Sequence, residues 1–334
     1  MKHSVLTLRK TAIVLSALTA LLIGVAVISV AVGPTSISLR DLWHVLVSPG
    51  GADLETTRLI IFDIRLPRVL LALIVGAGLS IAGTTFQALL RNPLAEPYIL
   101  GISSGGTIGA ILAIAIGAGL SQIFTPLFSF AGSGLVMVLV FALGRRRGFM
   151  DPHALLLSGV MVGAFFNAII LLVVSLLHQE MRTAFLWLLG NLSDADFGSL
   201  LLVGPLIIIA SGLLMLQGRR FNLISTGDET ATYLGVDVPR VQKQSYLLAS
   251  FITGLAVSVS GVIGFVGLLV PHSCRLLFGP DHRLLLPASF LAGGIFLILC
   301  DLLARMVLAP AEIPVGAITA LVGAPLFIYL LKRS

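Results

Sequence analysis

The chain is a succession of long apolar stretches separated by short polar breaks. A helix needs about 20 apolar residues to cross the hydrocarbon core of a bilayer, so each such stretch is a candidate membrane span. The sequence predicts ten of them, at residues 11–32, 67–90, 97–117, 123–143, 155–177, 200–217, 244–263, 265–278, 284–304 and 313–331. The predicted fold class is therefore all-α, a polytopic membrane protein, with residues 1–334 forming a single transmembrane domain.

Composition excludes the alternative of a soluble domain. With 57% hydrophobic residues, 11% charged residues and a mean hydropathy of +1.07, the chain has too few polar side chains to cover an ordinary water-exposed surface. The eighth segment is short and contains Pro271, His272 and Arg275, so we expect it to be broken or tilted and buried among its neighbours. The first span follows basic residues, but its apolar run is longer than that of a signal peptide, and we expect it to be retained.

The basic residues predict the orientation, because short cytoplasmic loops retain Lys and Arg. With a cytoplasmic N-terminus and ten spans, 15 of the 21 basic residues lie on the inner side, and the other six are Arg40, Arg58, Arg65, Arg68, Arg182 and Arg305. Both termini are therefore expected in the cytoplasm. The net charge of +6 fits contact with anionic membrane lipid and gives no reason to expect nucleic acid.

The turn from Arg91 to Gly105 contains two prolines between two apolar runs. Pro93 and Pro97 each fix a φ angle and remove a backbone donor, which predicts a rigid surface that meets a partner. Further on, Gly101, Gly105 and Gly109 recur every four residues, a pattern that lets two membrane helices approach closely.

The longest inner loop, residues 219–243, contains a candidate helix for a partner to bind. Thr226 can cap this helix, Glu229 is placed as in a capping box, and Gly235 can end it. A solvated linker is the alternative. The sequence has no GxxxxGK[ST] phosphate loop, so energy from ATP is expected to arrive through a partner.

Two features are predicted near the outer ends of the spans. Gly190 stops the segment before it, and Ser193 is placed to cap a second, short helix at about 193–199. Asp301 lies four residues before Arg305, so the two side chains can pair along one helix face, and we expect Asp301 to hold Arg305.

Five separated motifs resemble those of the FecCD-type permeases, in the same order. They are Arg65-Leu66-Pro67-Arg68, then Arg91 to Pro97, then Gly227 to Gly235, then Gly264 to His272 with Asp281-His282-Arg283, and finally Ala311 to Gly316 with Gly323-Ala324-Pro325. Members of this family are the membrane subunits of ABC importers for iron–siderophores, haem and cobalamin. The resemblance implies the BtuC-like fold of type II importers, with about ten helices per subunit.

The resemblance also implies partners and a location. We expect a second permease subunit, as a homodimer or with a close paralogue, in the cell inner membrane. Two ATP-binding subunits, which hold ATP and magnesium, are implied on the cytoplasmic side, and a periplasmic or lipid-anchored binding protein on the outside. No cofactor, metal site or catalytic residue is expected in this chain, and Cys274 and Cys300 are expected to be buried free thiols.

Site residues follow from the matched motifs. The coupling helix of the family matches Gly227, Asp228, Glu229, Thr230, Leu234 and Gly235, and the arginines that bind acidic residues of the binding protein match Arg65, Arg68 and Arg305. The outer gate matches Gly190, Asn191 and Ser193, and the inner gate matches Asp151, Pro152 and His153, a triplet that differs from the small hydroxyl residues of the cobalamin member. Iron–siderophore is the first choice of cargo, with haem and cobalamin behind it.

Two other classes of protein fit the sequence less well. An ion-coupled secondary transporter would need buried acids at mid-membrane, but Asp301 and Glu312 both lie near an outer end. A membrane enzyme would need titratable groups that converge in one pocket, whereas His178, His272 and Arg275 fall on separate segments.

Overall fold

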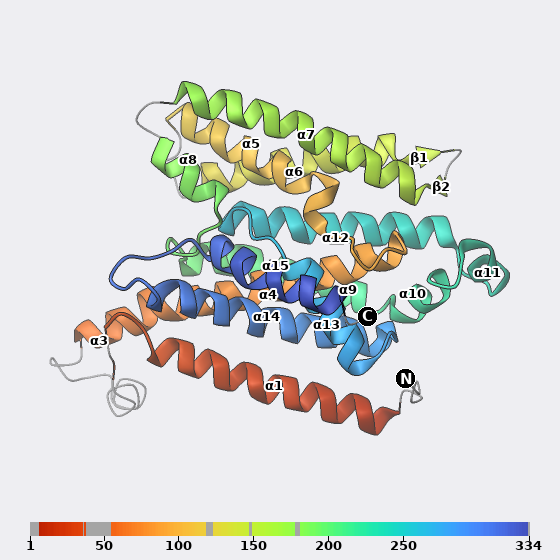
Figure 1. Ribbon diagram of the computed structural model, residues 1–334, viewed down its shortest axis with the longest axis horizontal. Coiled ribbons are helices and arrows are strands. Elements are labelled where there is room, and N and C mark those ends of the chain that lie inside the picture. Colours follow the sequence, from red (N-terminus) through yellow and green to blue (C-terminus); the bar gives the residue numbers. More distant parts are fainter. Residues whose placement is uncertain are drawn as a thin grey trace.

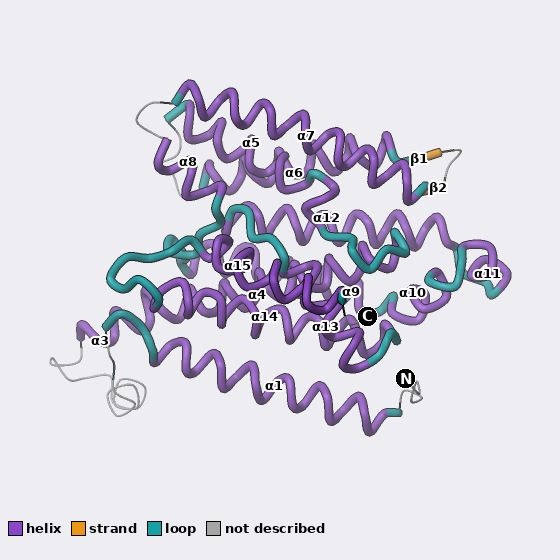
Figure 2. The backbone as a smooth tube through the Cα atoms, viewed as in Figure 1, coloured by secondary structure: helices purple, strands orange, loops and turns teal. Residues whose placement is uncertain are grey.

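The computed structural model describes residues 7–35, 37, 55–117, 123–146, 149–177 and 181–332. Within these ranges the protein is a bundle of helices with one short antiparallel hairpin, formed by Arg145–Arg146 (β1) and Phe149–Met150 (β2) (Figure 1 and Figure 2). The predicted all-α fold class is confirmed.

A helix is present at each of the ten predicted spans. These helices are α1 (Leu8–Ala31), α4 (Leu66–Leu89), α5 (Ile102–Ala115), α6 (Phe124–Leu143), α7 (Pro152–Leu176), α9 (Phe197–Met215), α12 (Val238–Ser260), α13 (Val266–Phe278), α14 (His282–Met306) and α15 (Val315–Leu331). Short helical pieces connect them: α3 (Glu55–Leu59), a π-helical turn (Ile60–Arg65), a 3₁₀ turn (Pro97–Leu100), α8 (Met181–Leu188), α10 (Gly218–Ile224) and α11 (Asp228–Tyr233).

Not all ten helices have the length and composition of a simple span. Six are long and apolar enough to cross a membrane by themselves: α1, α6, α7, α9, α14 and the continuous helix that ends with α4. The apolar helices α5 and α13 are shorter because the chain enters each through a stretch that is not α-helical, at residues 92–101 and 261–265. The short, buried eighth segment predicted from Pro271 and His272 is therefore confirmed as α13.

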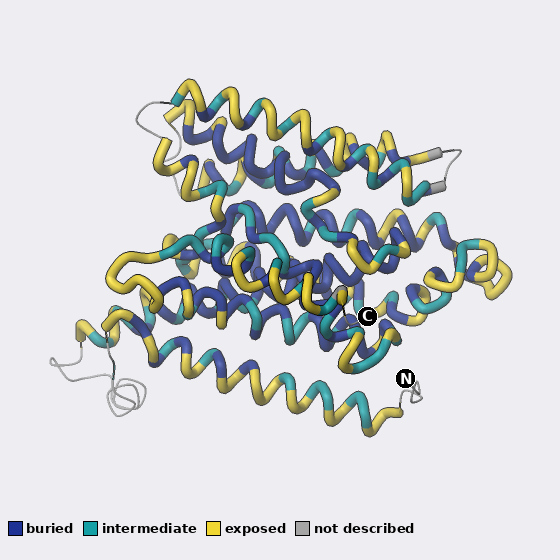
Figure 3. Tube along the Cα trace, in the orientation of Figure 1, coloured by how far each residue is buried: buried dark blue, intermediate teal, exposed yellow. Residues whose placement is uncertain are grey.

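Helix α4 forms the centre of the bundle. Nearly all of its side chains are buried, and it packs against α9, α12, α13 and α14 (Figure 3). Glycines allow the closest approaches, because a Cβ atom at Gly76 would overlap the backbone of Gly293 in α14, and one at Gly83 would overlap the backbone of Gly267 in α13. At these points the helices touch through backbone atoms.

The predicted glycine face of α5 is confirmed at Gly105 and Gly109, whereas Gly101 lies against Gly159 and Gly163 in α7. Cβ atoms at Gly105 and Gly109 would overlap the backbone of α6 at Gly132 and Phe128. The two helices therefore pack closely along the face that the four-residue spacing indicated.

The two ends of the bundle differ. Helix α11, the β1–β2 hairpin and the start of α1 lie at one end, whereas α3 and α8 lie at the opposite end (Figure 1). The end that carries α11 also holds Arg145, Arg219, Arg220, Arg240 and Lys243, which are among the residues predicted to face the cytoplasm.

The separate short helix predicted at 193–199 is absent from this part of the described chain. Residues 193–194 form a turn, and the backbone N–H of Ser193 donates to Asn191 Oδ1 at 3.0 Å. Asp196 caps the next helix, α9, by accepting from the backbone N–H of Ser199 at 3.0 Å and from its hydroxyl at 2.7 Å. The carboxylate of Asp196, three residues after Ser193, supplies the stronger, charge-assisted cap. The short helix at this end of the bundle is instead α8.

Substitution of Gly83 tests the backbone contact at the centre of the bundle. We expect Gly83→Ala to lower the free energy of unfolding by about 1–3 kcal/mol, because the new methyl group forces α4 away from α13. Gly212→Ala in α9 is the control, because the added Cβ has no atom of a neighbouring helix within 4 Å, and it should change stability by no more than about 1 kcal/mol. Thermal unfolding of both variants in the same detergent measures the difference, and equal midpoints would contradict the proposed contact.

Candidate functional site

Five charged residues gather at the end of the bundle that carries α3. Arg68 donates from Nε to Asp301 Oδ1 at 2.9 Å and from Nη1 to Glu312 Oε2 at 2.8 Å. Arg305 forms an ion pair with Asp301, with Nε 3.0 Å from Oδ2. The predicted pairing of Asp301 with Arg305 is confirmed, and Asp301 also holds Arg68.

Helix α1 completes this cluster of five charged residues through its C-terminal carbonyl groups. Arg65 donates to the carbonyl oxygens of Val30 at 3.0 Å and Ala31 at 2.8 Å, and Arg305 donates to the Ser29 hydroxyl at 2.6 Å. The last carbonyls of a helix have no partner within the helix, so these arginines satisfy groups that would otherwise be unpaired away from water.

This arrangement corrects one prediction about the arginines. Arg65, Arg68 and Arg305 are predicted to bind acidic residues of a binding protein, which requires them to be accessible, but their exposed fractions are only 3%, 4% and 3%. Each of these arginines can be buried because its guanidinium group has hydrogen-bond or ion-pair partners within the chain. The exposed member of the cluster is Glu312, whose side chain is 38% exposed.

The opposite end of the bundle carries the predicted coupling helix. α11 runs from Asp228 to Tyr233, with Gly227 before it at φ 125° and Gly235 after it at φ 83°. The predicted capping box is wrong at its first residue, because the Thr226 hydroxyl donates to the carbonyl of Leu223 at 2.8 Å and caps nothing in α11. The predicted end of the helix at Gly235 is confirmed.

Helix α11 presents most of its surface to solvent. Only Ala231 is fully buried in it, whereas Glu229 and Thr230 are exposed, Tyr233 is 91% exposed and Leu234 is 61% exposed. A large aromatic and an aliphatic side chain side by side in solvent are unusual on a stable helix end and are typical of a surface that a partner covers.

Helix α10 fixes α11 to the bundle. The side chain of Asn222 in α10 donates to Asp281 Oδ1 and accepts from the backbone N–H of His282, both at 2.8 Å. Arg283 also donates to Asp281, and this hydrogen bond holds the pKa of the Asp281 carboxyl well below its usual range. Asp281, which anchors α10 beneath α11, therefore keeps its negative charge at neutral pH.

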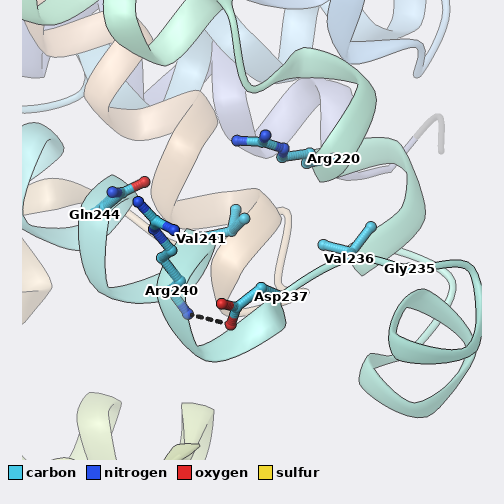
Figure 4. Close-up of a pocket in the computed structure, with 7 residues that line it drawn as sticks. All are labelled: Arg220, Gly235, Val236, Asp237, Arg240, Val241 and Gln244. Atoms are coloured by element: carbon cyan, nitrogen blue, oxygen red, sulfur yellow. Dashed lines mark hydrogen bonds between the residues drawn. The ribbon is translucent and has the colours of Figure 1, made fainter.

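A pocket of about 320 Å³ lies beside α11, between α10 and the start of α12. Arg220 and Arg240 line it together with Gly235, Val236, Asp237, Val241 and Gln244 (Figure 4). Asp237 caps α12 by accepting from the backbone N–H of Arg240 at 3.2 Å. The pocket has room for one or two side chains of a neighbouring protein.

The residues matched to the two gates lie at the start of α7 and after the end of α8. Asp151 caps α7 by accepting from the backbone N–H groups of His153 and Ala154, at 2.9 and 3.2 Å, and Pro152 occupies the first turn. After α8, Gly190 has φ 69° and its carbonyl accepts from the backbone N–H of Gly316, while the backbone N–H of Asn191 donates to the carbonyl of Ser260 at 2.9 Å. One position begins a helix and the other follows one, and a gating role for either remains a prediction.

Three contacts across the bundle are not predicted by the sequence: Arg91 with Asp228, Glu96 with the backbone N–H of Phe265, and Arg68 with Glu312. A carboxylate such as Glu96, between two prolines in an apolar stretch, was itself a signal, because a buried carboxylate needs a donor. Among the described residues, no group of three or more His, Cys, Asp or Glu side chains is placed to hold a metal ion, and Cys274 and Cys300 are buried and unbridged.

Asp301→Asn tests whether the charged cluster at the α3 end stabilises the fold. With this carboxylate neutralised, Arg68 and Arg305 are left buried beside each other, and we expect a loss of about 3–5 kcal/mol in the free energy of unfolding. Glu312→Gln removes the same charge from a half-exposed position and should cost no more than about 1 kcal/mol. Equal thermal midpoints for the two variants in detergent would show that burial does not decide the strength of these pairs.

Comparison with known proteins shows relatives along almost the whole chain. The family model of the FecCD transport family matches residues 21–333. The chain is 42% identical to the cobalamin import system permease protein BtuC of Halobacterium salinarum over 278 residues, a region that covers 83% of this chain and 74% of that protein. It is 40% identical over 320 residues to the hemin transport system permease protein HmuU of Yersinia pestis, covering 94% of this chain and 93% of the relative.

Structure gives the same result. A solved structure described as an inward-facing conformation of a putative metal-chelate type ABC transporter superposes with a TM-score of 0.86 at 33% identity, over 96% of this chain and 99% of the other. By sequence and by structure, the chain belongs to the FecCD transport family.

Proposed function

We propose that this protein is the membrane-spanning permease subunit of a binding-protein-dependent ABC importer that moves a metal chelate across the cell inner membrane. The observation that carries the proposal is the exposed surface of α11, with Tyr233 and Leu234 in solvent at one end of a bundle of apolar helices. A separate pair of ATP-binding subunits, which bind ATP and magnesium, covers this surface and supplies the energy.

The concentration of basic residues at the α11 end supports an orientation with this end and both termini in the cytoplasm. A second copy of the chain completes the pathway as a homodimer. The cluster formed by Arg65, Arg68, Asp301, Arg305 and Glu312 then faces the outside, where a binding protein docks.

Docking at this cluster takes a specific form. Three arginines and two acids give it a net charge of +1, and Glu312 alone among them is substantially exposed. An acidic residue of the binding protein therefore reaches Arg68 by taking the place of Glu312. The arginine keeps an ionic partner throughout, so docking costs little desolvation.

For the cargo, an iron–siderophore complex is the first choice, and haem and cobalamin are the alternatives. The two relatives described above carry the names of cobalamin and hemin systems at nearly equal identity. Sequence identity to these permeases therefore does not indicate which chelate is carried. This fits an importer whose binding protein selects the cargo.

Substitution on α11 tests the proposed ATPase contact. We expect Tyr233→Asp combined with Leu234→Asp to weaken co-purification of the ATPase by at least about tenfold, because a buried aromatic anchor commonly contributes 2 kcal/mol or more to an interface. Leu277→Asp is the control, since this side chain is 74% exposed at the end of α13 and lies outside α11. An ATPase that binds the double variant and the Leu277→Asp control equally well would contradict the assignment of α11.

Transport by the purified complex tests the function itself. Proteoliposomes that contain the permease, its ATPase and its binding protein should accumulate one of three cargos, a ferric siderophore, haem or cobalamin, only when ATP and magnesium are supplied on the α11 side. Uptake driven by a proton gradient without ATP would identify an ion-coupled secondary transporter instead.

A further inference from the structure

The segment from Arg91 to Tyr98 connects α11 to the break between α12 and α13. One end of the segment contacts α11 through Arg91, and the other contacts residues 263–265 through Glu96 and Tyr98. This connection runs from the exposed end of the bundle to its interior, because the 3₁₀ turn at Pro97–Leu100 lies against α4, α7 and α12, and Pro97 contacts Gly267 in α13.

Arg91 holds the exposed end. It follows the C-terminus of α4 with φ 47°, in the left-handed region that favours glycine, and Asn92 N–H donates to the carbonyl of Gln87 at 3.1 Å, as in a Schellman motif. Its guanidinium forms an ion pair with Asp228 at the first residue of α11, and Gln242 in α12 also approaches this carboxylate, at 3.4 Å. A glycine would satisfy the backbone better, but only a long cationic side chain can make this contact.

The middle of the segment is rigid. Asn92 Oδ1 accepts from the backbone N–H of Leu94 at 2.9 Å, and the Asn92 carbonyl accepts from Ala95, which is buried. Pro93 and Pro97 fix two φ angles, and the Pro97 ring packs against Gly267 in α13. A displacement at Arg91 is therefore passed along the segment with little internal bending.

The interior end is held by two hydrogen bonds. Glu96 Oε1 accepts from the backbone N–H of Phe265 at 2.6 Å, and the Tyr98 hydroxyl accepts from the backbone N–H of Ile263 at 3.0 Å. Phe265 has φ 69°, so both described non-glycine residues with positive φ stand at the two ends of this connection. The Phe265 ring lies against Gly323 in α15, which extends the contact to a third helix.

We propose that residues 91–98 act as a strut that transmits movement of α11 to the α12–α13 break, with Arg91 as the positioning residue at its cytoplasmic end. The inference rests on the proposed function, in which α11 is the surface that the ATPase moves. The ion pair is the adjustable part of the strut, since both side chains are more than a third exposed, and the hydrogen bonds of Glu96 and Tyr98 are the fixed part.

A reporter on the strut tests the proposal in the assembled transporter. Leu94 is 41% exposed, so Leu94→Cys can carry an environment-sensitive fluorophore, while Cys274 and Cys300 are buried and stay unlabelled. With the ATPase bound, we expect a change of emission on addition of a non-hydrolysable ATP analogue. This change should disappear in Arg91→Ala, which keeps a Cβ and therefore the same backbone preference at this position.

ATP hydrolysis gives a second readout. Stimulation of the ATPase by loaded binding protein should fall about two- to fivefold in Arg91→Ala, as expected for loss of a half-exposed ion pair, while the ATPase still co-purifies. The charge exchange Arg91→Asp with Asp228→Arg should restore the emission change, because the pair is re-formed in reverse. Arg219→Ala removes an exposed cation on α10 at the same end and serves as the control.

The outcomes separate the strut from the proposed function. An emission change that persists in Arg91→Ala, with the ATPase bound, would overturn the strut. In a doubly exchanged protein that still co-purifies with the ATPase, failure to restore the lost signal would also overturn it, because the loss would then not arise from this pair. An ATPase that does not bind the unmodified permease would overturn the proposed function instead.

Discussion

Every backbone N–H and C=O group inside a membrane protein needs a partner, because no water reaches it there, and this constraint shapes the whole bundle. Helices satisfy it within themselves. Two stretches that are not α-helical, residues 92–101 and 261–265, lie against each other, and Glu96 and Tyr98 in the first accept from the backbone N–H groups of Phe265 and Ile263 in the second. The breaks that make α5 and α13 short are therefore paired, and each depends on the other.

The same constraint explains the charges at the α3 end. Helix α1 ends at Ala31 with carbonyl groups that lack partners, and Arg65 supplies the donors. Burying this cation beside Arg68 and Arg305 requires acids nearby, which Asp301 and Glu312 provide. The cluster thus ties α1, α4 and α14 together at one end, while the opposite end keeps α11 open to a partner.

The ten helices could be predicted because an apolar stretch of span length has few alternatives to a helix in lipid. The end of α11 followed from Gly235, since few other residues adopt its positive φ. The start of α11 and of α9 could not be predicted in this way, because Thr226 and Ser193 had competing partners close by. The burial of Arg68 was missed for another reason: its partners Asp301 and Glu312 lie 233 and 244 residues away in the sequence, and spacing carries no signal over such distances.

The backbone contacts of α4 at Gly76 and Gly83 have a consequence for how such a protein diversifies. A contact made by backbone atoms does not depend on which side chains the helices carry elsewhere. Helices α6 and α7 bury little of their surface, so residues there can be exchanged without disturbing the frame around α4. Substitutions on these outer surfaces are therefore expected to be tolerated, whereas substitutions of the glycines at the centre force the helices apart.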